Sequence, residues 1–316
     1  MIGEIFAVIS ALFFSSAGIT IRRGMRTAYD DGVFLCTLIN VIVFLALLPV
    51  LYVVKRLPPL NLIGFLLFAA AGLLTTFGGR ALHFAAIRKI GPSRAVPFRS
   101  SSPIVTICLA YVFLSERLSP ADLIGTAAII GGIWYLSREI SERSDLAVER
   151  KNFQPVRRAP QRRESPQRYR PSLSGILFGI FASISFGTGH FLRKMAMLEV
   201  PSPYWGVAIG SVVGLLAVVA QSCVKGEFLS ICRYNLNVKA PPWHFISAGI
   251  LTTVGQLACY LAIFYTSVSI AMVLISSEPL GTVIISRLFL GTEESLNWRV
   301  YSSALIVFGG IAVIFL

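Results

Sequence analysis

The sequence predicts an all-α integral membrane protein, with ten transmembrane helices arranged as two inverted five-helix repeats. Three observations support this fold class. Of the 316 residues, 55% are hydrophobic and only 14% are charged, and the mean hydropathy is +0.74; about a quarter of a soluble domain is charged. Apolar runs recur at the length of a membrane span. The two halves of the chain also resemble each other, which indicates a duplication.

Ten runs carry few or no charges and are each about 17 to 25 residues long, enough for a helix to cross about 30 Å of hydrocarbon. They cover residues 4–21, 33–54, 61–87, 93–114, 120–136, 172–192, 203–224, 243–265, 268–290 and 297–316. Barrel strands would alternate polar and apolar residues over about ten positions, and these runs do not. The first run has no basic segment before it, so we expect it to be retained and not cleaved as a signal peptide.

The internal repeat defines the domain organisation. LLTTFGGRALHFAAI (73–87) matches ILTTVGQLACYLAIF (250–264) at its Thr-Thr-x-Gly and at two later alanines. The match continues with Ser100-Ser101 over Ser276-Ser277, Pro103 over Pro279, Glu116 over Glu294, and Gly131-Gly132 over Gly309-Gly310. The sequence therefore predicts a first repeat over 1–136 and a second over 172–316. Five spans per repeat make the second copy enter the membrane from the opposite side, an arrangement typical of alternating-access transporters.

Three features of each copy also support a family resemblance. Each copy has a proline in its fourth helix, a Phe-Leu element containing glutamate (FLSERLS at 113–119, FLGTEESL at 289–296) and a closing Gly-Gly helix. In these features the chain resembles the EamA branch of the drug/metabolite transporter superfamily, over nearly its whole length outside 137–171. The resemblance implies a ten-helix carrier of metabolites or drugs, in a family whose substrates include amino acids, nucleotide-related compounds and amphipathic toxins. It does not identify the substrate.

The segment 137–171 between the repeats is charged, rich in proline and contains ten Lys or Arg residues. This composition predicts a disordered connector. It is either a tether in solvent or a polybasic strip on anionic lipid, where each basic residue contributes about 1 kcal/mol. Because ten of the 28 basic residues lie here and others lie at membrane edges, the net charge of +13 requires no nucleic-acid partner.

The distribution of basic residues predicts the orientation. Lys and Arg number 21 in the loops on the connector side and 5 on the other. By the positive-inside rule the connector is cytoplasmic and both termini face outward, whereas the family resemblance implies that the termini lie inside. We expect a multi-pass protein of the plasma (inner) membrane.

Ionisable groups at membrane depth are the candidate functional residues, because each costs about 2.5–3.5 kcal/mol at a helix centre and usually faces a cavity or a partner. Helical spacing pairs several of them with polar neighbours on the third, fourth, eighth and ninth spans. The predicted substrate-binding set is Arg80, His83, Arg99, Ser102, Gln256, Tyr260 and Glu278. An alternative is an ion pair of Glu278 with Arg99 or Arg80 that only locks the halves together. We expect His190 to be a satisfied interior histidine.

Two further patterns concern helix mechanics. Pro103 and Pro279 each leave a carbonyl four residues earlier without its helical donor, which predicts hinges in helices that line a cavity. The small-residue pattern GSVVG (210–214) either supports a homodimer or packs within the chain.

The function predicted from these residues is secondary active transport of a small organic metabolite by alternating access. An anionic solute is favoured, because Arg80 and Arg99 outnumber the single Glu278. The alternatives are a proton-coupled exporter of cationic amphiphilic drugs, with Glu278 holding proton and drug in turn, and a non-catalytic membrane scaffold. No H-E-x-x-H, G-x-S-x-G or paired carboxylates occur in the chain, so we expect no enzyme activity and no catalytic residue. Five cysteines without C-x-x-C spacing predict no disulfide framework and no metal site, and we expect no cofactor.

Overall fold

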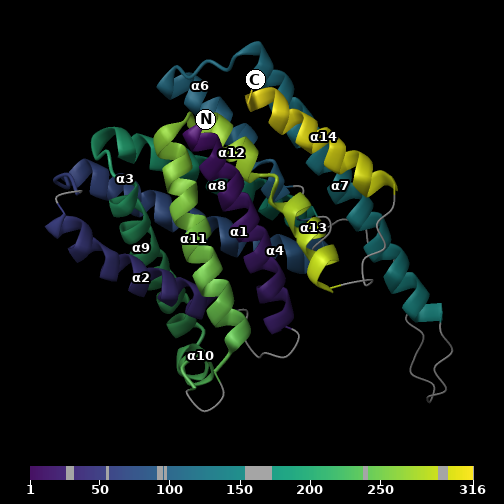
Figure 1. Cartoon of the computed structure of the whole chain (residues 1–316). Coiled ribbons are helices and arrows are strands. Elements are labelled where there is room, and N and C mark those ends of the chain that lie inside the picture. Colours follow the sequence, from purple (N-terminus) through teal and green to yellow (C-terminus); the bar gives the residue numbers. More distant parts are fainter. Residues whose placement is uncertain are drawn as a thin grey trace.

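The computed structural model describes the chain except residues 26–31, 55–56, 91–94, 96–97, 154–172, 238–240, 291–297 and 316. The described part is helical and contains no strand. Figure 1 shows the helices gathered into one bundle, with both termini at the same end and the short helix α10 (Phe228–Asn235) at the other.

The first half contains α1 (Ile2–Met25), α2 (Val33–Val53), α3 (Leu62–Gly72), the π-helix η1 (Leu73–Gly79), α4 (Arg80–Ile90), α6 (Ser102–Leu114) and α7 (Pro120–Phe153). The second half contains α8 (Leu173–Glu199), α9 (Pro203–Val224), α10, α11 (Trp243–Tyr265), α12 (Val268–Ile275), α13 (Glu278–Leu290) and α14 (Trp298–Phe315). A helical turn at residues 98–100 precedes α6.

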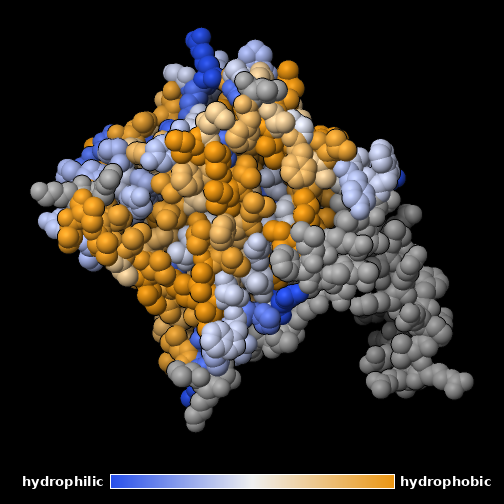
Figure 2. Space-filling view, viewed as in Figure 1, coloured by the Kyte–Doolittle hydropathy of each residue, from blue (hydrophilic) through white to orange (hydrophobic). Residues whose placement is uncertain are grey.

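Seven helices of the described part are long and apolar enough to cross a membrane. The other three expected runs coincide with the shorter apolar helices Phe98–Leu114, Pro120–Leu136 and Tyr301–Phe315. Figure 2 shows apolar residues covering much of the visible face of the bundle, and large side chains such as Phe113 and Leu305 are exposed on its surface. Such a surface is stable in lipid and not in water, so the chain is an integral membrane protein.

The helices of the two halves pack reciprocally. The first helix of one half lies on the third helix of the other, as α1 does on α11 and α8 on α3, η1 and α4. The second helices, α2 and α9, pack on each other, and so do the last, α7 and α14. A duplicated five-helix unit predicts such exchange-symmetric contacts.

Glycines permit the close approach of α7 and α14. A Cβ on Gly132 would lie 2.7 Å from the Val307 side chain, and one on Gly310 would lie 2.8 Å from the carbonyl oxygen of Gly125. Gly131 and Gly309, the first glycines of the two Gly-Gly pairs, have open space instead. The second glycine of each pair therefore faces the partner helix.

Two expected features take a different form in the structure. Helix α7 continues to Phe153, within the segment for which composition predicts a disordered connector, and residues 154–172 lie outside the described part. In the GSVVG pattern, Gly210 lies against the backbone of Gly72, and Gly214 lies against the Thr76 side chain. These small residues thus pack α9 on α3 and η1 within the chain, which is the second of the two uses that the sequence allowed.

Candidate functional site

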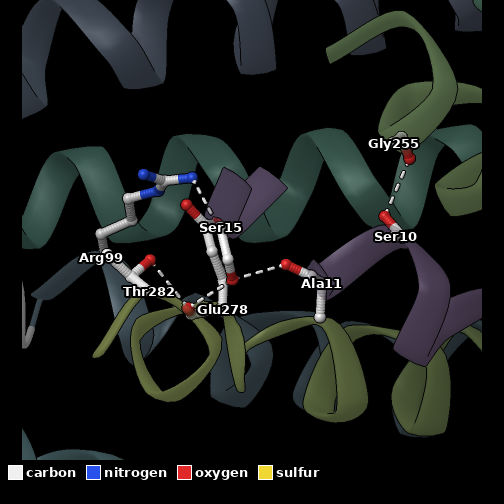
Figure 3. A network of polar contacts seen from close by, with 7 residues as sticks. All are labelled: Ser10, Ala11, Ser15, Arg99, Gly255, Glu278 and Thr282. Carbon is white, nitrogen blue, oxygen red and sulfur yellow. Dashed lines mark hydrogen bonds and ion pairs between the residues drawn. The ribbon is translucent and has the colours of Figure 1, made fainter. Parts of the chain in front are cut away.

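The two halves meet at an ion pair between Arg99 and Glu278. The Arg99 Nη2 atom lies 3.0 Å from Glu278 Oε2 (Figure 3), and the two side chains are 49% and 21% exposed. Of the two pairings that the sequence left open for Glu278, the structure forms this one. A cation from the first half and an anion from the second therefore lie together.

A break in the ninth span positions Glu278. Helix α12 ends at Ile275, a turn follows, and α13 begins at Glu278 with Pro279 in its first turn, where a missing N–H costs little. The Ser15 hydroxyl of α1 donates to the Glu278 carbonyl at 2.7 Å, and the Thr282 hydroxyl donates to it at 3.0 Å (Figure 3). Gly281 permits this contact, because a Cβ there would collide with the Ser15 hydroxyl.

The matching break in the fourth span positions Arg99. The turn at Ser101 separates residues 98–100 from α6, and Pro103 lies in the first turn of α6. Both prolines predicted as hinges therefore begin a new helical segment after a break.

A buried polar stripe of α6 follows Arg99 in the sequence. Ser102, Thr106 and Ala110 continue its helical stripe and are all buried, with the Thr106 hydroxyl donating to the Gly187 carbonyl of α8 at 3.1 Å. Arg99 itself lies in the helical turn before α6 and is half exposed. Its guanidinium also lies 5.9 Å from the centre of the Phe186 ring, within cation–π range.

Two histidines lie on helices that pack against each other, His83 on α4 and His190 on α8. The Nδ1 atom of each ring is buried and has no hydrogen-bond partner among the described residues. His190 was expected to be a satisfied interior histidine, but this nitrogen is not satisfied within the described part.

A second polar cluster surrounds Arg193 of α8, which is 4% exposed. Its Nη2 donates to the Thr75 hydroxyl at 2.8 Å, its Nη1 lies 3.5 Å from Cys259 Sγ, and its guanidinium lies 4.5 Å from the centre of the Tyr260 ring. Its Nε and the Tyr260 Oη are buried and have no partner in the described part of the chain. Arg193 is thus an interior cation with no carboxylate among the described residues beside it.

Arg193 and Lys194 were expected in a loop after the span 172–192, and this expectation was wrong. Helix α8 continues to Glu199, so both residues lie inside it. Without these two residues the basic count on the sparse side falls from 5 to 3, and the bias toward the connector side keeps its sign.

The other predicted residues are separated. Tyr260 is buried beneath Arg193, and Gln256 lies one turn earlier on α11, half-buried. Ser102 is buried where α6 meets Gly187. Arg80 lines a pocket between α2, α4 and α9 that contains neither Arg99 nor Glu278. His83, three residues further along α4, is buried and is not among the residues that line this pocket.

Polar contacts join the helices at the end of the bundle that holds the N-terminus. The Glu116 carboxylate accepts from the Val268 and Ser269 amides and from the Ser269 hydroxyl, at the start of α12. Lys194 Nζ donates to the carbonyls of Ile263 and Thr266 at 2.8 Å, and the Thr266 hydroxyl donates to Glu4. These contacts tie helices from both halves together at that end.

The chemistry available in this interior is recognition by charge and hydrogen bonding. No group of three or more potential metal ligands occurs among the described residues. The fold defines the class as helical integral membrane proteins, and the Arg99–Glu278 pair joins the two halves of the chain.

The comparisons with known proteins identify the family. Residues 1–138 and 173–316 match the EamA-like transporter family, so the chain belongs to that family, in the drug/metabolite transporter superfamily. A solved structure described only as "Crystal structure of protein" is similar in fold, with a TM-score of 0.66 and 14% identity, over 99% of this chain and 96% of the other. No curated protein matches the sequence.

Proposed function

We propose that the protein is a secondary active transporter that moves a small organic anion by alternating access, through ten spans arranged as two inverted repeats. The observation that carries this proposal is the partly exposed Arg99–Glu278 pair, contributed by both halves at the breaks of their fourth helices. Irregular backbone at membrane depth is tolerated where it lines a cavity, and transporter binding sites lie at the interface of such repeats.

One face of α8 connects the two charged clusters. Phe186, His190 and Arg193 follow one another at helical spacing and form a stripe from the Arg99 guanidinium to the Thr75–Tyr260 cluster. Beyond Arg193 come the contacts of Lys194 and Glu116 at the end that holds the N-terminus. The proposed path of the solute follows this stripe, and these contacts close it at that end.

An anionic solute fits the charges along this path. Glu278 offsets Arg99, and Arg193 remains without a carboxylate among its described neighbours. An uncompensated buried cation is costly in a membrane, and a carboxylate or phosphate arriving from outside would lower that cost. Pro103 and Pro279 are the proposed hinges between the two access states.

A cationic drug would need the Glu278 carboxylate free, and Arg99 occupies it. We therefore rank drug export second and a non-catalytic scaffold third. A thermal-stability assay of the full chain, purified in neutral detergent, separates these functions. The solutes to compare are organic carboxylates, phosphate esters, cationic amphiphiles and neutral solutes.

We expect a member of the anionic group to stabilise the protein. Arg193→Gln should lower the affinity for that solute at least tenfold, because it removes a charge-assisted contact of about 1.5–3 kcal/mol. Arg117→Gln, which removes an exposed arginine, is the matched control and should bind normally. Stabilisation by cationic amphiphiles alone, lost in Glu278→Gln, would establish drug transport instead. No response to any solute would favour the scaffold.

A further inference from the structure

The pocket that contains Arg80 lies apart from the proposed transport path. It has a volume of about 130 Å³ and is bordered by the start of α2, by η1 and α4, by the end of α9 and by α10. Its polar lining comprises Thr76, Arg80, Gln221, Ser222, Lys225 and Glu227, and Phe34, Phe77, Phe84 and Val218 are among its apolar residues. It is thus partly polar and partly apolar, at the end of the bundle opposite the termini.

The adjoining helix α10 is short and lies at the end of the bundle opposite the termini (Figure 1). Gly226 has a φ of +70° and turns the chain sharply between α9 and α10. Phe228 packs edge-on against Phe34 of α2, whereas Val224 and Leu229 are 89% and 81% exposed. A short helix with half-buried and exposed apolar residues beside Lys225 and Arg233 is typical of a membrane interface.

The charges of the pocket are suited to an anion. Arg80 approaches from the membrane-spanning helix α4 and Lys225 from the C-terminus of α9, and Glu227 is the one carboxylate among the described residues that line the pocket. Basic pockets between transmembrane helices at the membrane surface bind lipid headgroups. The aromatic and aliphatic lining residues below the charges offer a surface for the first part of the acyl chains.

We propose that this pocket binds the phosphodiester headgroup of an anionic phospholipid, with Arg80 and Lys225 as its cationic ligands. The bound lipid would bridge α4 of the first half to α9 and α10, which are consecutive in the second half. Arg80 then has a role independent of transport substrate.

The test measures binding of dioleoyl phosphatidylglycerol to the full chain, purified in neutral detergent. Native mass spectrometry detects the bound lipid, and the midpoint of thermal unfolding reports the stabilisation that it causes. Dioleoyl phosphatidylcholine has the same chains and no net charge, and glycerol 3-phosphate has the phosphate without the chains. We expect the anionic lipid to bind at least about tenfold more tightly than either.

Arg80→Gln and Lys225→Gln should each lower the affinity for the anionic lipid severalfold, because each removes about 1 kcal/mol of binding free energy. The double variant should lower the affinity roughly tenfold or more. Arg233→Gln is the matched control, because Arg233 lies on α10 but does not line this pocket; it should bind the lipid normally. If Arg80→Gln does not fold, Lys225→Gln alone carries the test.

Three results would overturn the proposal: unchanged binding in Lys225→Gln, an equal loss in Arg233→Gln, or equal affinity for glycerol 3-phosphate. The first two would show a diffuse surface charge effect, and the third would show a soluble phosphate site.

Discussion

The hydroxyl of Ser269 donates a 2.8 Å hydrogen bond to the carboxylate of Glu116, and so joins the end of α6 to the start of α12. The same carboxylate accepts from two backbone amides of the first turn of α12. An anion at a helix N-terminus satisfies donors that the helix cannot satisfy itself and interacts favourably with the helix dipole. Glu116 of the first half therefore caps a helix of the second, and it does so at the end that we propose is closed.

Glu116→Ala should lower the free energy of unfolding in detergent by about 1–2 kcal/mol, the range measured for lost helix caps. It should also favour opening at this end, because the cap exists only when α6 and α12 are together. Thermal unfolding and the reactivity of a cysteine introduced at Ser267 measure the two effects. Arg117→Ala changes the neighbouring exposed residue as a control. If the Glu116→Ala variant keeps both its stability and its cysteine reactivity, this contact does not hold the end closed.

Helix contacts through glycine give a second prediction. A Cβ on Gly72 would lie 2.6 Å from the Cα of Gly210, where backbone leaves no room to adjust. Gly72→Ala should therefore cost about 1–3 kcal/mol of stability, as overpacking does. Gly309→Ala, where nothing lies within 4 Å, should be neutral or stabilising by up to about 1 kcal/mol through helix propensity. Equal unfolding midpoints for the two variants would contradict the close packing of α3 on α9.

Cys232 on α10 reports the orientation of the membrane protein. Burial raises the pKa of the Cys232 thiol, and the neighbouring Cys223 raises it further. The thiolate is the nucleophile, so labelling of Cys232 by a membrane-impermeant maleimide should be slow at neutral pH and accelerate as the pH rises. In a variant that retains only Cys232, we expect labelling in inside-out vesicles and protection in intact cells, as the basic-residue count predicts.

A variant that retains only the exposed Cys223, on the same side of the bundle, is the matched control and should give the same sidedness. Labelling of both variants from outside intact cells would reverse the orientation and agree with the family resemblance.

The helical membrane fold could be predicted because its signals, the apolar runs and the internal repeat, each extend over whole spans and do not depend on single residues. The candidate site was predicted in part. Glu278 and Arg99 were identified because a charge within an apolar run needs a partner, and they pair in the structure. The predicted end of the sixth span was wrong at Arg193, because a charged residue was taken to end a span. Helix α8 instead buries this charge among Thr75, Cys259 and Tyr260.

Arg80 and His83 show a different limit. Spacing places them on one side of α4, but the π-helical segment Leu73–Gly79 before them changes the direction in which that side points, and their surroundings depend on how α4 packs on α8 and beside α9. A π-helix has no clear compositional signal, and helix rotation is set by tertiary contacts that one sequence does not display. The surroundings of these two residues therefore required the structure.

The last prediction concerns the central pair itself. Arg99 is half exposed, so the pair contributes little to stability, about 0–1 kcal/mol. Arg99→Ala should accordingly leave the protein folded while it weakens binding of the anionic solute. Glu278→Gln keeps the backbone contacts of Ser15 and Thr282, which use the Glu278 carbonyl, and frees Arg99, so it should change solute affinity without loss of folding.

The double exchange Arg99→Glu with Glu278→Arg separates a structural lock from a binding site. Both roles allow the exchanged pair to form, because the two side chains remain opposite in charge at the same interface. A lock that only joins the halves would then keep transport near wild type in a proteoliposome uptake assay. A binding site would assemble, with an unchanged unfolding midpoint, and yet fail to transport, because the cation would now project from α13 instead of from the segment before α6. We expect the second result; wild-type uptake by the exchanged protein would remove Arg99 and Glu278 from the proposed site.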